Sequence, residues 1–274
     1  MNPLNPLYSL LPLSVALGFS WLLVKRYGAP AASGRFAAID GLRGFLAFFV
    51  FLHHAMVMYF YLRTGHWEIP ISHLYNHFGR SSVSLFFMIT AFLFYSKLIE
   101  GAENPIDWLK LYRSRILRLC PLYFSFLLLM ALIVAILLNF QIHENAALFW
   151  TQVFQWLTFT IFGRPDIEGI DSNWIVIMAG ATWTLPYEWI FYLSLPILAL
   201  TIKPSPLKIS IFAFSFAFAV FILWGPNLIN LFAFIGGIIA AMIVRIASLR
   251  LRLCSKVGAV TALSSLVATR CLVR

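Results

Sequence analysis

The sequence predicts an all-α fold, a polytopic bundle of about seven to nine transmembrane helices. Hydrophobic residues make up 61% of the 274 positions and charged residues only 11%, and the mean hydropathy is +0.87. Such a chain is too apolar for a soluble domain and too long for a single membrane anchor. The spans must be helices, because backbone groups in lipid need internal hydrogen bonds and no alternating pattern of a membrane barrel is present.

Individual spans are predicted where apolar runs approach the roughly 20 residues that cross a bilayer. Aromatic residues at the edges of some runs shorten the strictly aliphatic part. In chain order, the expected spans cover residues 7–24, 44–62, 82–96, 119–140, 183–202, 209–224 and 228–244.

The formal net charge of +10 indicates membrane topology. The basic residues lie at the ends of spans, which argues against a nucleic-acid partner, since such a partner requires one basic surface. The positive-inside rule places four clusters in the cytoplasm and the N-terminus outside. These clusters are Lys25, Arg26, Arg35 and Arg43; Lys97, Lys110, Arg113, Arg115 and Arg118; Lys203 and Lys208; and Arg245, Arg250, Arg252 and Lys256.

Residues 147–163 are apolar enough to span, but a span there would conflict with this topology. It would put Lys203 and Lys208 outside and the acidic segment 166–171 inside. We therefore interpret 147–163 as a re-entrant or interfacial segment, or as a span paired with a short return through residues 174–180.

The first apolar run is expected to be a retained helix. Within residues 1–24 no basic residue precedes the apolar run, and the positive charges follow it, which is the reverse of a secretory signal. The three cysteines (Cys120, Cys254 and Cys271) form no metal-like array, so we expect no metal site.

Few titratable residues are expected at membrane depth. Among ten acidic residues only Glu188 lies well inside a predicted span, and among six histidines only His53 and His54 do. An ionisable group there costs about 2.5 to 3.5 kcal/mol on insertion scales, which makes each a functional candidate. The alternative for each is a buried polar group that joins two helices.

Helical geometry separates the two histidines. Arg43 and His54 are eleven residues apart, which on a helix is a rotation within ~20° of three full turns and a rise of ~16 Å. His53 lies ~80° away from that direction, whereas Asp40 lies within ~40° of His54. One face therefore carries Asp40, Arg43 and His54, and His54 can act as a base near neutral pH.

Residues 107–124 combine an apolar arc with an opposite basic arc. This pattern predicts a cytoplasmic interfacial helix that leads to a span at Pro121. Arg115 and Arg118, one turn apart, are suited to hold the phosphates of a soluble anionic cofactor, because guanidinium groups bind phosphate with two donors. The alternative for Arg115 is snorkelling toward lipid phosphates.

Glu188 lies in the segment 182–198, which by this topology begins on the outer side of the membrane. Pro186 suits the first turn of a helix. Glu188 follows two residues later, near the positive end of the helix, where its charge is tolerated best.

These segments together resemble acyltransferase family 3, a family of multispanning membrane O-acyltransferases. The resemblance rests on four motifs in the family's order between residues 39 and 196. They are Asp40-Gly41-Leu42-Arg43-Gly44 with His54; Val83-Ser84-Leu85-Phe86-Phe87; Arg115-x-x-Arg118-x-x-Pro121-x-Tyr123; and Trp183-Thr184-Leu185-x-x-Glu188-x-x-Phe191-Tyr192-Leu193 with Pro196.

The resemblance implies transfer of an acyl group, usually acetyl from acetyl-CoA on the cytoplasmic side, to a hydroxyl of a cell-surface carbohydrate or its lipid-linked precursor. His54 would be the general base or acyl relay, and Asp40 or Glu188 would support its imidazolium. Glu188 would also orient the acceptor. Arg43, Arg115 and Arg118 would hold the acyl-CoA donor, with no permanently bound cofactor. The implied location is the inner membrane of a bacterial cell, and the sequence gives no indication of oligomeric state.

Some features depart from the family pattern. Thr90-Ala91 replaces the usual Ser-Gly before Phe92, which weakens the expectation of close helix approach there. Pro186-Tyr187 is bulkier than usual. The family commonly has about ten spans, whereas here the last one ends at Val244. We accordingly expect an extra N-terminal helix and cytoplasmic linker over 1–38, an acyltransferase-like membrane domain over 39–245, and a basic tail over 246–274. A truncated end, a frame-shifted end and a short subclass of the family would each account for this tail.

Two other functions are compatible with this pattern. A small-molecule transporter would also place His and Glu at membrane depth, but it usually has Gly- or Pro-broken helices in matching halves, which the sequence lacks. A non-catalytic membrane homologue acting as an assembly partner would fit the short C-terminal region.

Overall fold

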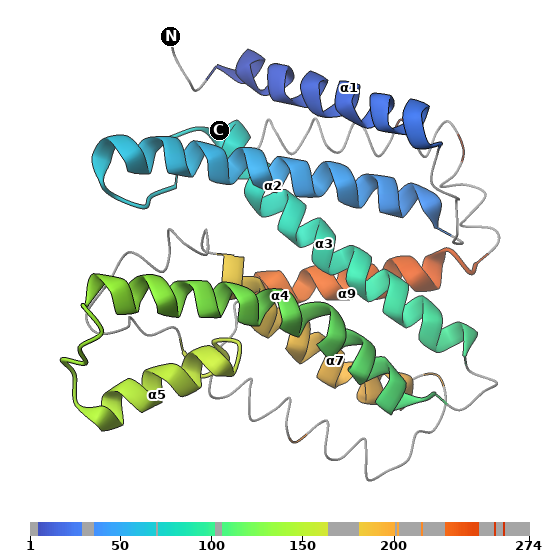
Figure 1. The fold of residues 1–274 in the computed structure, drawn as a ribbon. Coiled ribbons are helices and arrows are strands. Elements are labelled where there is room, and N and C mark those ends of the chain that lie inside the picture. Colours follow the sequence, from blue (N-terminus) through green and yellow to red (C-terminus); the bar gives the residue numbers. More distant parts are fainter. Residues whose placement is uncertain are drawn as a thin grey trace.

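The computed structural model describes residues 5–28, 36–69, 71–101, 106–163, 181–200 and 228–246, with positions 202, 215, 255 and 260. All regular structure within these residues is helical, as Figure 1 shows, which confirms the all-α class. Apart from Ser215, the predicted span 209–224 lies outside the described residues.

Among the described residues, four helices are long and apolar enough to cross a membrane. They are α1 (Leu10–Tyr27), α2 (Ala37–Thr64), α3 (His73–Glu100) and α4 (Trp108–Leu137). Three shorter helices follow, α5 (Ala146–Leu157), α7 (Thr184–Leu200) and α9 (Leu228–Ile243), and the 3-10 turns η1 (Pro6–Ser9) and η2 (Ala181–Trp183) precede α1 and α7. The total of seven to nine spans stays a prediction.

The helices alternate in direction, so that their basic ends meet. Figure 1 shows the C-terminal ends of α1, α3, α7 and α9 at the same end of the molecule as the N-terminal ends of α2 and α4. The terminal turns at this end contain Lys25, Arg26, Lys97 and Lys110, and Arg245 lies two residues after α9. The positive-inside rule requires such an arrangement, and the assignment of this end to the cytoplasm stays a prediction.

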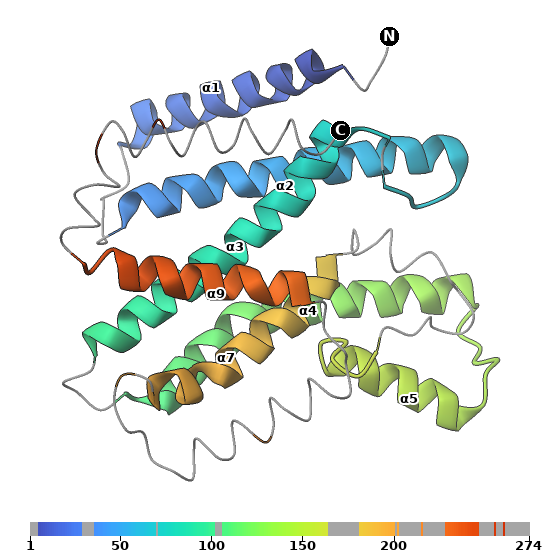
Figure 2. The same cartoon turned by 180° about the vertical axis from the view of Figure 1, so that it is seen from behind.

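The core forms where α3, α7 and α9 meet. The ring of Phe234 stacks on Phe87 and on Phe191, with ring centroids 4.7 Å apart in both pairs. Leu195 of α7 is completely buried in the same cluster. Helix α1, by contrast, has no buried residue and lies at the edge of the bundle in Figures 1 and 2.

The α3–α9 packing depends on a glycine. A Cβ atom on Gly237 would collide with the carbonyl oxygen of Met88 and lie 2.8 Å from the Cβ of Ala91, and Ala91 has no exposed surface. Two helices can approach this closely only where side chains are small. The Thr90-Ala91 pair is therefore compatible with close approach, because the glycine lies on the partner helix.

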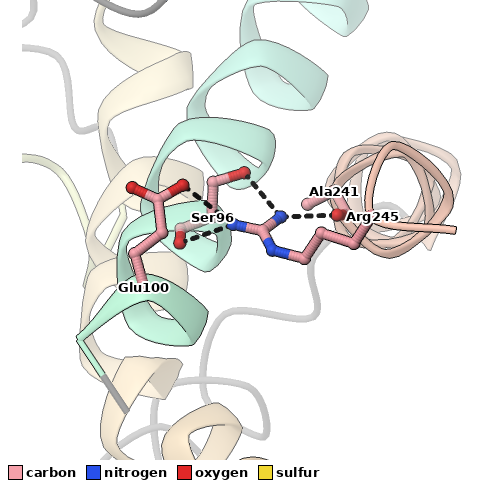
Figure 3. A network of polar contacts seen from close by, with 4 residues as sticks. All are labelled: Ser96, Glu100, Ala241 and Arg245. Carbon is pink, nitrogen blue, oxygen red and sulfur yellow. Dashed lines mark hydrogen bonds and ion pairs between the residues drawn. The ribbon is translucent and has the colours of Figure 1, made fainter. Parts of the chain in front are cut away.

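Arg245, two residues after α9, connects the basic ends of α3 and α9 through hydrogen bonds. Figure 3 shows its guanidinium group between the two helices. Nη2 donates to the carbonyl oxygen of Ser96 and to the Glu100 carboxylate, both at 2.9 Å, and Nη1 donates to the Ala241 carbonyl oxygen at 2.6 Å. The Arg245 guanidinium thus donates to a backbone carbonyl oxygen of each helix and to one carboxylate of α3.

Helix α4 is longer than the sequence indicated. The expected boundary between an interfacial helix and a span at Pro121 is wrong, since one helix runs from Trp108 to Leu137 with Pro121 inside it. Both halves are held by other helices: the Tyr112 hydroxyl donates to the Tyr192 carbonyl at 3.1 Å, and the Tyr123 hydroxyl to the Trp156 carbonyl at 2.6 Å. These two contacts connect α4 to α7 and α5 on either side of the proline.

Helix α5 is too short to cross a bilayer. Its 12 residues span ~18 Å, against a hydrocarbon core of roughly 30 Å. It is followed by turns in which Phe159 and Thr160 have positive φ angles. This geometry is consistent with a re-entrant or interfacial segment over 147–163, while the suggested return through 174–180 lies outside the described residues.

Candidate active site

A cavity of about 640 Å³ lies between α2, α3, α4 and the start of α7. Its volume falls within the range of small-molecule sites, roughly 300 to 1,000 Å³. The walls are largely apolar, with polar groups contributed from every side. These polar residues are Arg43 and His54 from α2, Thr90 and Lys97 from α3, Arg115 and Arg118 from α4, and Thr184, Glu188 and Tyr192 from α7.

One face of α2 forms a wall of this cavity. Arg43, Ala47, Val50 and His54 all line it, at the i, i+4, i+7 and i+11 positions that share a helix face. The His54 side chain is half-buried, and its Nδ1 atom is buried without a hydrogen-bond partner among the described residues. His54 thus lines the cavity, and one of its two ring nitrogens has no hydrogen-bond partner among the described residues.

His53 has different surroundings. Its Nδ1 atom lies 2.9 Å from the carbonyl oxygen of Tyr75 on α3. A carbonyl oxygen can only accept, so Nδ1 carries the hydrogen. The ring has room because residue 79 is glycine: a Cβ atom there would come within 2.7 Å of it. His53 joins α2 to α3 and does not line the cavity.

Arg115 and Arg118 enter the cavity from the N-terminal part of α4. The Arg115 guanidinium lies over the ring of Phe94, 5.1 Å from its centroid, and donates to the Ser114 hydroxyl at 3.0 Å. Arg118 is exposed. Arg115 thus points toward α3 and the cavity. Snorkelling toward lipid phosphates would not by itself explain this orientation.

Glu188 contributes a carboxylate to the cavity. The Tyr192 hydroxyl donates to its carboxylate at 3.0 Å, and the positive charges of Arg118, Arg115 and Arg43 act on it electrostatically. The sequence placed Glu188 near the outer side of the membrane. That side of the membrane stays a prediction. The structure brings Glu188, in the second turn of α7, into one cavity with arginines from the basic ends of α2 and α4.

Asp40 lies outside the cavity lining. Its carboxylate is 3.7 Å from the Arg43 guanidinium, one turn away on α2, and its side chain is 69% exposed. In this structure the acid therefore contacts Arg43 and is separated from His54 by about four turns of helix.

The cavity also contains polar residues that the sequence did not single out as site residues. Lys97 was grouped only with the basic loop, and Tyr192 only with a motif, yet both line the cavity. Lys97 is one turn after Leu93 and two turns after Thr90, which also line it. That spacing on α3 could have indicated Lys97 once Thr90 was known to face a site.

Comparison with known proteins identifies the family. A family model described as an acyltransferase domain matches residues 36–272. Neither a curated protein nor a solved structure matches the chain. The matched region contains all of the cavity residues described above. With four long apolar helices in the part of the chain that the structure describes, the protein is an integral membrane protein that belongs to acyltransferase family 3.

Proposed function

We propose that this protein is an O-acyltransferase that moves an acyl group, typically acetyl, from acyl-CoA to a hydroxyl of a cell-surface carbohydrate or its lipid-linked precursor. One observation carries the proposal: His54, three arginines and Glu188, which come from the three helices α2, α4 and α7, line one cavity. A base, a set of phosphate-binding cations and a carboxylate are the groups that transfer between a thioester and an alcohol requires.

The arginines form the donor half of the proposed site. Arg43, Arg115 and Arg118 come from the basic ends of two helices, and guanidinium groups form paired, charge-assisted hydrogen bonds with phosphate. Acyl-CoA would enter from the cytoplasm and direct its thioester along the α2 face toward His54. Asp40 would orient Arg43 through their contact.

His54 would act as the general base. Its imidazole accepts the proton of the acceptor hydroxyl while the hydroxyl oxygen attacks the thioester carbonyl carbon. The C–S bond then breaks, and the proton passes to the CoA sulfur. An ester and free CoA are formed. A histidine suits this role because its ordinary pKa lies near neutral pH. In the alternative course, His54 itself carries the acyl group between donor and acceptor.

Glu188 would orient the acceptor hydroxyl. Its carboxylate is held by Tyr192, whose own backbone carbonyl accepts from Tyr112 on α4. A carboxylate fixed in this way can accept a hydrogen bond from a sugar hydroxyl and stabilise the imidazolium of His54 during transfer. The proposed setting is the inner membrane of a bacterial cell, with the donor on the cytoplasmic side.

The experiment uses membranes containing the full chain and acetyl-CoA labelled in the acetyl group. The proposal expects label in the carbohydrate fraction, released by mild alkali as an ester would be, and expects His54→Ala to lose it. Transfer that resists alkali would argue against O-acylation. Wild-type membranes that neither consume acetyl-CoA nor label carbohydrate, tested with carbohydrate from the native host, would favour an assembly partner, and uptake of a small solute would favour a transporter.

A further inference from the structure

A second hollow of about 510 Å³ adjoins the active-site cavity at the basic end of the bundle. It lies between the C-terminal end of α3 and the N-terminal end of α4, and it shares Phe94, Lys97 and Arg115 with the first cavity. Lys110 and Ser114 complete its polar wall, together with two acids, Glu100 and Asp107.

Both acids are engaged by neighbouring groups. Glu100 accepts from Arg245 at 2.9 Å, and Asp107 accepts from the backbone N–H of Lys110 at 2.9 Å, capping α4. Neither Lys97 nor Lys110 has an ion-pair partner within the part of the chain that the structure describes. The hollow therefore presents two amines and the Arg115 guanidinium to an incoming anion. Of its two carboxylates, Glu100 is paired with Arg245, and Asp107 caps the N-terminus of α4.

The positive charges thus form two groups along one path. Arg43, Arg115 and Arg118 line the deeper cavity, and Lys97 and Lys110 flank the outer hollow, with Arg115 and Lys97 at the junction. His54 lies ~16 Å along the α2 axis from Arg43. The path suits a long donor with phosphate at two separate places and a reactive carbon at the far end.

Acyl-CoA has this distribution of charge. It carries a diphosphate in the middle of the molecule and a separate 3′-phosphate on its adenosine. We infer that the outer hollow binds the adenosine 3′-phosphate of the donor through Lys97 and Lys110, leaving the diphosphate to the arginines. This inference rests on the proposed function, since it assigns one end of the proposed donor. Lysine suits a terminal phosphate because its ammonium group is a compact charge with three donors.

The test measures binding of CoA and of 3′-dephospho-CoA to the purified full chain in phosphatidylcholine nanodiscs. Wild-type protein is expected to bind CoA about tenfold or more tightly than dephospho-CoA, as loss of a charge-assisted contact implies. Lys97→Ala and Lys110→Ala should each weaken CoA binding severalfold and reduce that preference, with little effect on dephospho-CoA. Lys110→Arg keeps the positive charge and should retain the preference for CoA. This variant also tests whether position 110 tolerates substitution.

Arg113→Ala is the matched control, because Arg113 is an exposed cation on the same part of α4 and lines neither hollow. It should leave both affinities unchanged. If wild-type protein binds CoA but the lysine variants weaken both ligands equally, the inference fails and the proposed function stands. If wild-type protein binds neither ligand, the proposed function fails as well.

An anionic lipid headgroup has the same phosphate chemistry, and the experiment separates the two sources. In nanodiscs containing phosphatidylglycerol, a nucleotide site keeps its preference for CoA over dephospho-CoA. Loss of that preference in wild-type protein, with phosphatidylglycerol binding abolished by Lys97→Ala and Lys110→Ala, would overturn the nucleotide assignment in favour of a lipid site.

Discussion

Arg43 and His54 line the same cavity from one face of α2, three helical turns apart. Two residues on the same face lie between them, the small Ala47 and then the aliphatic Val50. The α2 wall therefore offers a cation near its N-terminal end, an apolar stretch and then an imidazole. A donor bound at Arg43 can extend along this wall toward His54 without meeting another charge from α2.

The first prediction contrasts the adjacent histidines. His54→Ala should lower acyl transfer by about 10² to 10⁴, the usual effect of losing a positioned acid or base. His53→Ala removes a contact with the Tyr75 carbonyl outside the cavity, and so should cost mainly about 1 kcal/mol of stability. The measurement is product formed per amount of membrane protein. Equal losses at both positions would contradict the assignment of His54.

The second prediction concerns donor affinity. Arg115→Ala and Arg118→Ala should each weaken acetyl-CoA binding tenfold to a hundredfold, since each removes a charge-assisted phosphate contact of about 1.5 to 3 kcal/mol. Acetyl-CoA binding to purified variants gives the measurement, with Arg113→Ala as control. Unchanged affinity together with a collapse of expression would mean that these arginines anchor the helix in the lipid.

The third prediction uses the α3–α9 contact. Gly237→Ala should destabilise the protein by about 1 to 3 kcal/mol, because the added methyl group would overlap the Met88 carbonyl and the backbone cannot yield easily. Gly41→Ala is the control: nothing lies within 4 Å of its added Cβ, and alanine favours a helix. Thermal unfolding in detergent should separate the variants, and equal melting temperatures would show that α3 and α9 pack less closely.

The fourth prediction concerns the Arg245 link. Arg245→Met keeps much of the apolar stem but removes the donors to Ser96, Glu100 and Ala241. The expected cost is about 1 to 3 kcal/mol of folding stability, read again from thermal unfolding. Adding Glu100→Gln to this variant should cost little more, because the pair is already broken. Additive losses would show that the two residues act separately.

The fifth prediction fixes the sidedness of the membrane. In a variant with Cys120, Cys254 and Cys271 replaced by serine, Lys110→Cys and Ser205→Cys should resist an impermeant thiol reagent added to intact cells, because the positive-inside rule places both positions in the cytoplasm. Glu68→Cys, beyond the opposite end of α2, should react. Labelling at position 110 from outside would reverse the topology.

Much of the site was predictable from local periodicity. The fixed rotation of ~100° per residue decides which side chains share a helix face, so the separation of His54 from His53 follows from α2 alone. The same geometry placed Arg115 and Arg118 one turn apart, and the structure brings both into the cavity. Their roles in binding and catalysis stay predictions.

Other features depended on contacts between distant segments. Helical rotation places Asp40 on the same face of α2 as His54, yet Asp40 lies beyond the cavity and is exposed beside Arg43. Pro121 indicates a helix boundary by local rules, but α4 continues through it. Local patterns could not show how far a face extends into a site, nor that other helices would hold α4 on both sides of the proline.

The sequence by itself determined the helical membrane class, the basic ends of α1, α3 and α4, and the face of α2 that carries Arg43 and His54, because composition and helical rotation are properties of one segment. Only the tertiary structure decided that Glu188 would join the arginines, that Lys97 and Lys110 would flank a second hollow, and that Gly237 would give Ala91 a close partner. The physical reason is that these relationships depend on which helix faces pack together. Steric fit between residues as far apart in the chain as Met88 and Gly237 sets that packing.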